Sequence, residues 1–344
     1  MIVLLLISSY ISVYIPPDKW WTPAFLGLAY PYILVANLFF IVIWLLLKPM
    51  YLFISLIAVL TGWNYINRYF QANGKTTEGP AIKVISYNVK HFKSKGTRSS
   101  KANADSIRYF LKRQGADIIC LQEVRLRTNK IFDLPGVVKE LPGISHYQYA
   151  RTSSTGGSAT LTRYPIINMG EIRFEKSGNM AIYTDVLIQE DTLRIINLHL
   201  QSYHIDPGQY SKINFQRISE EEDIREMKKM GSKFKQAFIK RAVQARRIRE
   251  FIDNTPYNVI VCGDFNDTPV SYSYRTVKGS LNDAFIQSGK GFGRTYIGEL
   301  PSFRIDYIFH SDGFSSYNFQ SEEFVFSDHL PISCSLVKKA QLEK

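Results

Sequence analysis

Cysteine is scarce in this sequence, which limits the kinds of site that the chain can contain. The three cysteines, Cys120, Cys262 and Cys334, lie far apart in apolar, strand-like runs. No pair has the short spacing of a zinc site, and a thiol in such a run packs as a small hydrophobic side chain. The sequence therefore argues against a cysteine-ligated metal, and these residues indicate neither a compartment nor a redox role.

Charge is nearly absent from the first 72 residues. Four charged residues separate three apolar stretches there: Asp18, Lys19, Lys48 and Arg68 interrupt residues 1–17, 20–47 and 49–67. Helices of globular proteins carry a polar face, which these stretches lack, and each approaches or exceeds the roughly 20 residues that span a bilayer. We expect a transmembrane region of about three helices over residues 1–70, followed by a polar linker over residues 71–80.

A signal peptide is an alternative for the first stretch, but its usual features are missing. The stretch lacks a basic amino-terminal region and a small-x-small cleavage site, and two more apolar runs follow it. Lys48 is the only charge in the second loop, whereas Asp18 and Lys19 cancel in the first. By the positive-inside rule, the amino terminus and Lys48 are cytoplasmic, and three spans place the rest of the chain outside. The sequence thus predicts an integral protein of the cell (inner) membrane whose carboxy-terminal part is extracytoplasmic.

Acidic residues are outnumbered by basic ones, and the net charge is +12 at pH 7. Residues 1–80 contain four basic and two acidic residues, so ten of the twelve net charges belong to residues 81–344. A basic domain suits an anionic substrate or an anionic membrane surface.

Residues 81–340 are predicted to form a second domain made mostly of strands. Helices fit residues 101–114 and about 233–253, and no internal repeat is present. Strands are expected at residues 82–89, 117–122, 147–151, 157–163, 181–188, 192–200, 258–263, 304–310 and 330–337. Many strands with few helices argue against a singly parallel α/β fold.

Polar residues end six of the apolar runs in this domain. They are Asn88, Glu123, His199, Asp264 with Asn266, Asp306, and Asp328 with His329. Each one alone permits a structural interpretation: Glu123 could be the exposed rim of a strand, and the Asp264 segment an Asx-type turn. The ordered set within one domain-sized stretch is much more specific than any single motif.

Taken in order, these motifs resemble the endonuclease/exonuclease/phosphatase superfamily over roughly residues 81–337. The superfamily includes deoxyribonucleases, apurinic endonucleases, neutral sphingomyelinases and inositol-polyphosphate phosphatases. The resemblance implies an α+β fold, a four-layer α/β/β/α sandwich of two mixed sheets, and an enzyme that hydrolyses phosphate esters. The segments that carry it are Leu121-Gln-Glu123, Asn197-Leu-His-Leu200, Gly263-Asp-Phe-Asn266, Arg304-Ile-Asp-Tyr307 and Ser327-Asp-His-Leu-Pro331.

The resemblance also implies a metal site. Glu123 would bind Mg²⁺, with Mn²⁺ as an alternative, and Asn88 and Asp328 would complete the shell directly or through water. The chain departs from the apurinic endonucleases in its first motif, where their Asn-x-Asp is replaced by Asn88-Val-Lys90. A lysine cannot ligate a metal, which counts against a second ligand from this position.

Catalytic roles follow from the same resemblance. Asp264 would position or deprotonate the attacking water, and Asn266 would donate a hydrogen bond to a phosphate oxygen. His199 and His329, the latter oriented by Asp306, would stabilise negative charge or protonate the leaving group.

The histidines also bear on the branch of the superfamily. His199 is similar to the sphingomyelinase and deoxyribonuclease branches, whereas a tyrosine stands there in the apurinic branch, so an abasic site is not the expected substrate. The remaining histidines are interpreted as structural: His91, His146, His204 and His310.

A long connection over residues 201–257 contains a basic amphipathic helix. Its nine basic residues occur with no acid among them: Lys228, Lys229, Lys233, Lys235, Lys240, Arg241, Arg246, Arg247 and Arg249. A sheet-covering helix explains its apolar stripe, and an added contact with anionic lipid explains the absence of acids. In the later loop Gly291–Tyr296, we expect Arg294 and Tyr296 to contact the substrate.

Three functions remain open at this point. The first is a membrane-anchored, metal-dependent phosphoesterase, a phosphodiesterase or phosphatase, acting on a phospholipid or related anion. The second is a membrane-tethered nuclease, because a basic face serves a nucleic-acid backbone equally well. The third is a catalytically silent binding module, against which the presence of every matched group argues.

Overall fold

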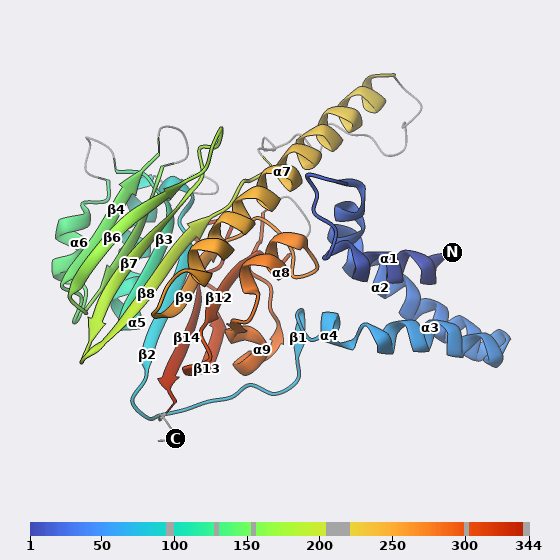
Figure 1. Cartoon of the computed structure of the whole chain (residues 1–344), viewed down its shortest axis with the longest axis horizontal. Helices are drawn as coiled ribbons and strands as arrows, with labels where there is room; N and C mark the ends of the chain where they lie inside the picture. The colour runs from blue at the N-terminus through green and yellow to red at the C-terminus, as the bar shows by residue number, and fades with distance from the viewer. Residues whose placement is uncertain (94–99, 127–130, 153–155, 204–220, 299–302, 340–344) are drawn as a thin grey trace. The chain divides into compact units, whose positions relative to one another are not determined.

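The computed structural model describes the chain except residues 94–99, 127–130, 153–155, 204–220, 299–302 and 340–344. It consists of two compact units (Figure 1), each made of three segments. The smaller unit contains Met1–Tyr69, Gln201–Arg249 and Asn266–Val277. The larger contains Phe70–Leu200, Glu250–Phe265 and Lys278–Lys344.

The larger unit is built on two six-stranded mixed sheets. One has the order β10-β12-β9-β8-β7-β6, with strands Asn282–Asp283, Asp306–His310, Asn258–Asp264, Asp191–His199, Met180–Ile188 and Ile166–Arg173. The other has the order β13-β14-β2-β3-β5-β4, with strands Phe314–Ser321, Ile332–Lys338, Ile82–Asn88, Ile118–Val124, Gly157–Thr162 and His146–Arg151. A separate short pair joins β1 (Phe70–Gln71) to β11 (Gly291–Phe292).

Apolar side chains from the two sheets pack together in one core. Ile118 of β3, Ile260 of β9 and all three cysteines belong to this cluster. The cysteines are free and buried. Their interpretation as packing residues is therefore confirmed.

The larger unit also contains the helices α5 (Ser100–Gln114), α6 (Leu134–Glu140) and α9 (Ala284–Ser288) and the short 3₁₀ turn η1 (Lys90–Phe92). Helix α7 (Glu221–Asp253) contributes its last turn, from Glu250 onward, to this unit. Ile107 and Leu111, one turn apart on α5, pack in the same cluster as Tyr87 of β2. On the other sheet, Phe251 in the last turn of α7 packs on Tyr183 of β7, with ring centroids 4.9 Å apart.

The predicted α+β class with two packed mixed sheets is confirmed. All nine predicted strands are present, with ends shifted by at most two residues. The two-residue strands β1, β10 and β11 were not predicted, nor were β6 and β13. Both β6 and β13 lie at the end of a sheet and have several partly exposed residues, so neither forms an apolar run in the sequence.

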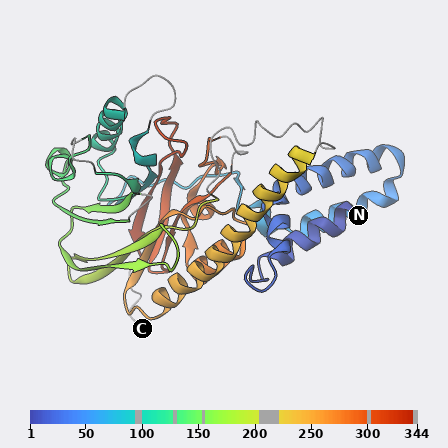
Figure 2. The ribbon, with the colours of Figure 1, turned by 90° about the horizontal axis from the view of Figure 1, so that it is seen from above.

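The smaller unit begins with apolar helices. These are α1 (Ile2–Ser12), α2 (Thr22–Leu47), α3 (Pro49–Thr61) and the single turn α4 (Trp63–Ile66). α2 and α3 lie side by side as an antiparallel pair that reverses at Lys48 (Figure 2). Among the described helices, α2 alone is long and apolar enough to cross a membrane. With 11 and 13 residues, α1 and α3 are about 16 and 20 Å long, so two of the three expected helices are shorter than a full span.

Residues 266–277 pack within this smaller unit, although they come just after strand β9, which ends at Asp264 and belongs to the larger unit. Val270 belongs to the apolar cluster of the amino-terminal helices, and Arg68 Nη1 donates to the carbonyl of Pro269 at 2.8 Å. A Cβ on Gly27 of α2 would lie 2.3 Å from the Val270 carbonyl oxygen, so a larger side chain would not fit. The amino-terminal helices thus share one compact unit with residues 266–277.

The same unit supplies partners for several basic residues of helix α7. Arg246 forms a two-bond salt bridge with Asp18, at 2.9 and 2.8 Å, and Lys235 Nζ lies 5.0 Å from the ring centroid of Trp21. Several of the cations therefore have partners in distant parts of the chain. Packing within the unit thus explains more of the basic residues of this helix than the sequence suggested. Of the nine basic side chains from Lys228 to Arg249, those that stay exposed are Lys228, Lys229 and Arg247.

A buried ion pair in this unit gives a stability prediction. Arg241 of α7 is fully buried, with Nε 3.1 Å from Asp267 Oδ2 and Nη1 donating to the carbonyl of Gln201 at 2.8 Å. Arg241→Met leaves the Asp267 carboxylate buried without its partner, so we expect a loss of about 3–5 kcal/mol. Denaturant unfolding of the full chain in detergent measures it, with exposed Arg247→Met as the matched control. A loss no larger than that of the control would contradict this account of α7.

Candidate active site

The ends of neighbouring strands bring the polar clusters of the sequence to one edge of the sandwich. Parallel pairing of β8 with β9 places His199 opposite Asp264, and antiparallel pairing of β12 with β9 places Asp306 opposite the same residue. In the second sheet, the parallel strands β2 and β3 align Asn88 with the residue before Glu123. Register alone therefore assembles residues that are far apart in the sequence.

Asn88 connects the two sheets at this edge. Its Nδ2 donates to Glu123 Oε1 at 3.2 Å and to Asp264 Oδ2 at 2.9 Å. Its Oδ1 accepts a hydrogen bond from the backbone N–H of Lys90 at 3.0 Å. The amide of Asn88, which the resemblance assigns to the metal shell, thus contacts both carboxylates.

Glu123 occupies an unusual backbone position beside three polar side chains. Its φ of 55° lies in the left-handed region, which few non-glycine residues adopt. Its Oε2 lies 3.2 Å from His91 Nε2, and its Oε1 lies 3.7 Å from His199 Nε2. Burial raises the pKa of Glu123, so a nearby cation would stabilise the ionised form of this carboxylate.

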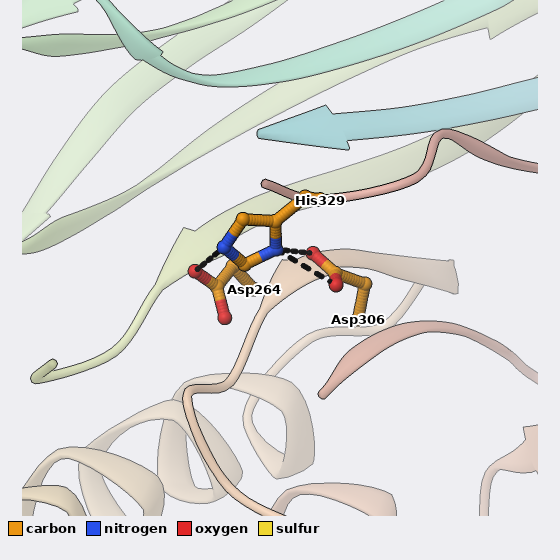
Figure 3. Close-up of side chains that lie close together, drawn as sticks. All are labelled: Asp264, Asp306 and His329. Carbon is orange, nitrogen blue, oxygen red and sulfur yellow. Dashed lines mark hydrogen bonds and ion pairs between the residues drawn. The ribbon is translucent and has the colours of Figure 1, made fainter. Parts of the chain in front are cut away.

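His329 lies between two carboxylates, as Figure 3 shows. Its Nδ1 is 3.1 and 3.0 Å from the two oxygens of Asp306, and its Nε2 is 3.7 Å from Asp264 Oδ2. Burial alone would lower the pKa of His329, but Asp306 and Asp264 outweigh it and raise the pKa to about 10. The imidazole is therefore charged at neutral pH and held in a fixed orientation.

Asp328, the neighbour of His329, has its own cation. Lys90 Nζ lies 2.6 Å from Asp328 Oδ2, and Ser327 Oγ donates to Oδ1 at 3.3 Å. Burial would raise the pKa of Asp328, but His329 and Lys90 outweigh that effect and hold the pKa below its usual value. Asp328 is thus a stable carboxylate.

The predicted substrate-contact residues differ in their positions. Tyr296 pairs with His329 as an isolated β-bridge, with the ring centroids 5.3 Å apart. Arg294 is exposed, and its carbonyl accepts a hydrogen bond from Ser321 Oγ at 2.6 Å. Asn266 is half-buried in the turn after β9, where its φ is 52°. Tyr296 is therefore the one that the structure places against His329.

Sequence reasoning missed two residues of this site. His91 was interpreted as structural, yet its Nε2 contacts the Glu123 carboxylate. Lys90 was considered only because a lysine cannot ligate a metal, yet its Nζ contacts the Asp328 carboxylate. Both lie within three residues of Asn88, but only the left-handed backbone of this turn brings them to the site. His146 and His310 lie in strands, His310 being buried and bonded to Gln287 Oε1 at 3.0 Å, and His204 lies outside the described residues.

Two groups of side chains are candidates to hold a divalent ion. Asp264, Asp306 and His329 offer ligand atoms within 4.8 Å of one another. Because the two ring nitrogens of His329 face the carboxylates of Asp306 and Asp264, the same trio also fits proton transfer. The buried Glu123 carboxylate, close to that of Asp264 through Asn88, offers the oxygen donors that Mg²⁺ or Mn²⁺ prefers.

Family models match both parts of the chain. The model described as the endonuclease/exonuclease/phosphatase family matches residues 85–329. A second model, described as a domain of unknown function (DUF8431), matches residues 1–69. Among curated proteins, none matches the chain.

Solved structures share the fold at low sequence identity. Truncated Caenorhabditis elegans TDP2 is 17% identical with a TM-score of 0.53, over 74% of this chain and 97% of that one. The human Nocturnin catalytic domain with bound sulfate is 17% identical with a TM-score of 0.53, over 75% and 95%. An endonuclease/exonuclease/phosphatase from Bacteroides vulgatus is 17% identical with a TM-score of 0.51, over 76% and 100%. At this identity the likeness concerns the fold alone.

Proposed function

Because the chain belongs to the endonuclease/exonuclease/phosphatase family, we propose that it hydrolyses a phosphate ester with a divalent metal ion. The observation that carries this proposal is the convergence of Glu123, Asp264 and His329, with Asn88 bridging the first two and Asp306 orienting the third. A silent binding module has no need for this arrangement of charged, oriented groups.

A bound Mg²⁺ or Mn²⁺ near Glu123 would neutralise charge on the phosphate group. The Asp264 carboxylate holds the attacking water and takes its proton, since its Oδ2 already lies within 3.7 Å of Asn88, His199 and His329. Asn266, two residues later, donates to a phosphate oxygen. Water then attacks phosphorus in line with the leaving group.

The two histidines act on the negative charge that develops during this attack. His329 carries a proton at neutral pH, held towards Asp306, and can stabilise the phosphate oxygens or protonate the leaving group. His199 Nε2 lies 3.6 Å from Asp264 Oδ2 and serves the same side of the site. Tyr296, beside His329, and the exposed Arg294 contact the substrate.

A phospholipid or a related lipid anion is the substrate class we propose first. The α2–α3 pair leaves many large apolar side chains exposed, which favours contact with the hydrocarbon of a bilayer. With Lys48 at the cytoplasmic turn of that pair, the catalytic unit lies on the extracytoplasmic side of the inner membrane. Protease added to spheroplasts should then digest the catalytic unit. Protection of this unit from the protease would indicate the opposite orientation. The exposed side chains include Val35, Phe39, Val42, Leu46, Phe53 and Ile57.

Nucleic acid is the second candidate substrate, favoured by the exposed cations of α7. The experiment that tests the proposal compares a generic phosphodiester, a phosphomonoester, lipid vesicles and plasmid DNA as substrates of the purified full chain in detergent. We expect metal-dependent hydrolysis of the generic diester and preference for the lipid. Failure to hydrolyse any ester in the presence of Mg²⁺ or Mn²⁺ would contradict the proposal.

The exposed cations of α7 give a prediction that separates the two substrates. Replacing Lys228, Lys229 and Arg247 by glutamine should shift the equilibrium of the full chain from anionic towards zwitterionic vesicles by tens of fold, because each cation near headgroups contributes about 1 kcal/mol. Flotation of mixed vesicles measures the ratio of protein bound to anionic and to zwitterionic vesicles. Insertion of the apolar helices contributes equally to both kinds of vesicle and cancels in this ratio. The control triple, with equal charge, is Lys112→Gln, Lys139→Gln and Lys176→Gln.

Nucleic acid predicts a different response from the same variant. If these side chains track a phosphate backbone, the affinity for DNA falls and its salt dependence flattens by about one unit of slope for each lost phosphate contact. The vesicle ratio then stays unchanged. Equal results for the two triple variants in both assays would leave α7 with its packing role alone.

A further inference from the structure

Three consecutive residues after Asn88 have left-handed backbone conformations. Lys90, His91 and Phe92 have φ values of 44°, 55° and 59°, and each such non-glycine residue costs roughly 1–2 kcal/mol. The turn is held by the hydrogen bond from Lys90 N–H to Asn88 Oδ1 and by Phe92, which stacks on Phe132 with ring centroids 4.5 Å apart. Strain of this kind is concentrated at functional sites in proteins.

The strained turn directs two side chains to two different carboxylates. Lys90 Nζ lies 2.6 Å from Asp328 Oδ2, while His91 contacts both the carboxylate and the carbonyl oxygen of Glu123, at 3.2 and 3.1 Å. Gly156, with φ of 79°, packs against the His91 ring, since a Cβ there would lie 2.9 Å from Nδ1. The turn thus places different groups beside the two carboxylates proposed for the metal shell. Asp328 contacts the ammonium group of a lysine, which is permanently charged, whereas Glu123 contacts an imidazole.

We propose that Lys90 is a built-in cation that occupies Asp328, so that the chain holds one divalent ion, on the Glu123 side, and takes no second ion at Asp328. This inference rests on the proposed metal-dependent function. An ammonium group 2.6 Å from the carboxylate already supplies the charge that a second ion would bring there. Lys90 is therefore a positioning residue that acts through Asp328.

The number of Mn²⁺ ions bound per chain tests this inference without any measurement of hydrolysis. Free Mn²⁺ is counted by electron paramagnetic resonance during titration of the full chain in detergent at pH 7. We expect one ion per chain for the unmodified protein and for Lys90→Arg, and a second, weaker ion for Lys90→Gln. In the double variant Glu123→Gln/Lys90→Gln, the ion at Asp328 should remain while the first is lost.

Each outcome distinguishes the inference from the function on which it rests. Two ions in the unmodified chain would overturn the role of Lys90 and leave metal-dependent hydrolysis intact. One ion in a folded Lys90→Gln variant would also overturn it, whereas no Mn²⁺ binding to the unmodified chain would remove both proposals. If Lys90→Gln fails to fold, the stoichiometries of the unmodified chain and of Lys90→Arg still decide, because two ions in either contradict the inference.

Discussion

Glu123→Gln is expected to lower kcat/KM for a generic phosphodiester by roughly 10³-fold or more, because one carboxylate anchors the metal ion that stabilises the transition-state charge. Glutamine preserves the shape of the side chain and its contact with Asn88 while removing the negative charge. The fold should be unaffected or slightly stabilised, since burial already disfavours the ionised form of Glu123.

A second measurement on the same variant separates metal binding from catalysis. Saturating Mn²⁺ should raise the melting temperature of the unmodified chain, because a ligand that binds only the folded state stabilises it. The shift should disappear in Glu123→Gln and persist in Glu140→Gln, an equivalent change at an exposed residue outside the site. Unaltered metal-dependent activity in folded Glu123→Gln would show that the metal is assigned to the wrong carboxylate.

His329→Asn is expected to lower the rate by about 10²–10⁴-fold, the usual contribution of a general acid or base. Asp264→Asn should have an effect of similar size, because the amide cannot take a proton from water. His310→Asn is the matched control, since His310 is also a buried histidine of the larger unit, but it is bonded to Gln287 and not to a carboxylate. Normal rates in folded His329→Asn would exclude its proposed role.

The pH dependence tests whether His329 acts in its protonated form. Its pKa of about 10 in the folded protein means that the proton is present across the neutral range and is lost as the pH rises towards 10. The rate should therefore fall on the alkaline side. Asp306→Asn removes the carboxylate that raises this pKa most, so the alkaline limb should move to lower pH. If the rate fell over the same alkaline pH range in the unmodified protein and in Asp306→Asn, the Asp306–His329 pair would not be the source of the pH dependence.

The sandwich and most of the site could be predicted from the sequence because both depend on strands with clear apolar runs. Once Asp264, His199 and Asp306 are placed at strand ends, the register of β8, β9 and β12 brings them together. The positions of these residues after strands, together with the fold implied by the resemblance, therefore predicted their proximity.

The roles of Lys90 and His91 could not be predicted in this way. Lysine and histidine give no sign that the backbone enters the left-handed region, and this conformation alone turns their side chains to Asp328 and Glu123. It is stabilised by tertiary contacts of Asn88 and Phe92 that local sequence does not reveal.

The basic helix shows a similar limit. No acid lies among the basic residues from Lys228 to Arg249, although Lys229 pairs with Glu226 one turn earlier, with Nζ 2.6 Å from Oε1. The acids that balance Arg241 and Arg246 are Asp267 and Asp18, the latter 228 positions away. Hydropathy likewise predicted the apolar region but overestimated its helices, because α1 ends before Pro16 and α3 ends before Gly62.

Hydrolysis in ¹⁸O-labelled water tests the central claim most directly, which is that this edge of the sandwich catalyses attack of water on phosphorus. The full chain, freed of metal and then supplied with Mg²⁺ or Mn²⁺, would be given bis(p-nitrophenyl) phosphate in H₂¹⁸O. The account predicts one ¹⁸O atom in the p-nitrophenyl phosphate product and no turnover in excess chelator. Label found in the p-nitrophenol, or an undiminished rate in chelator, would contradict it.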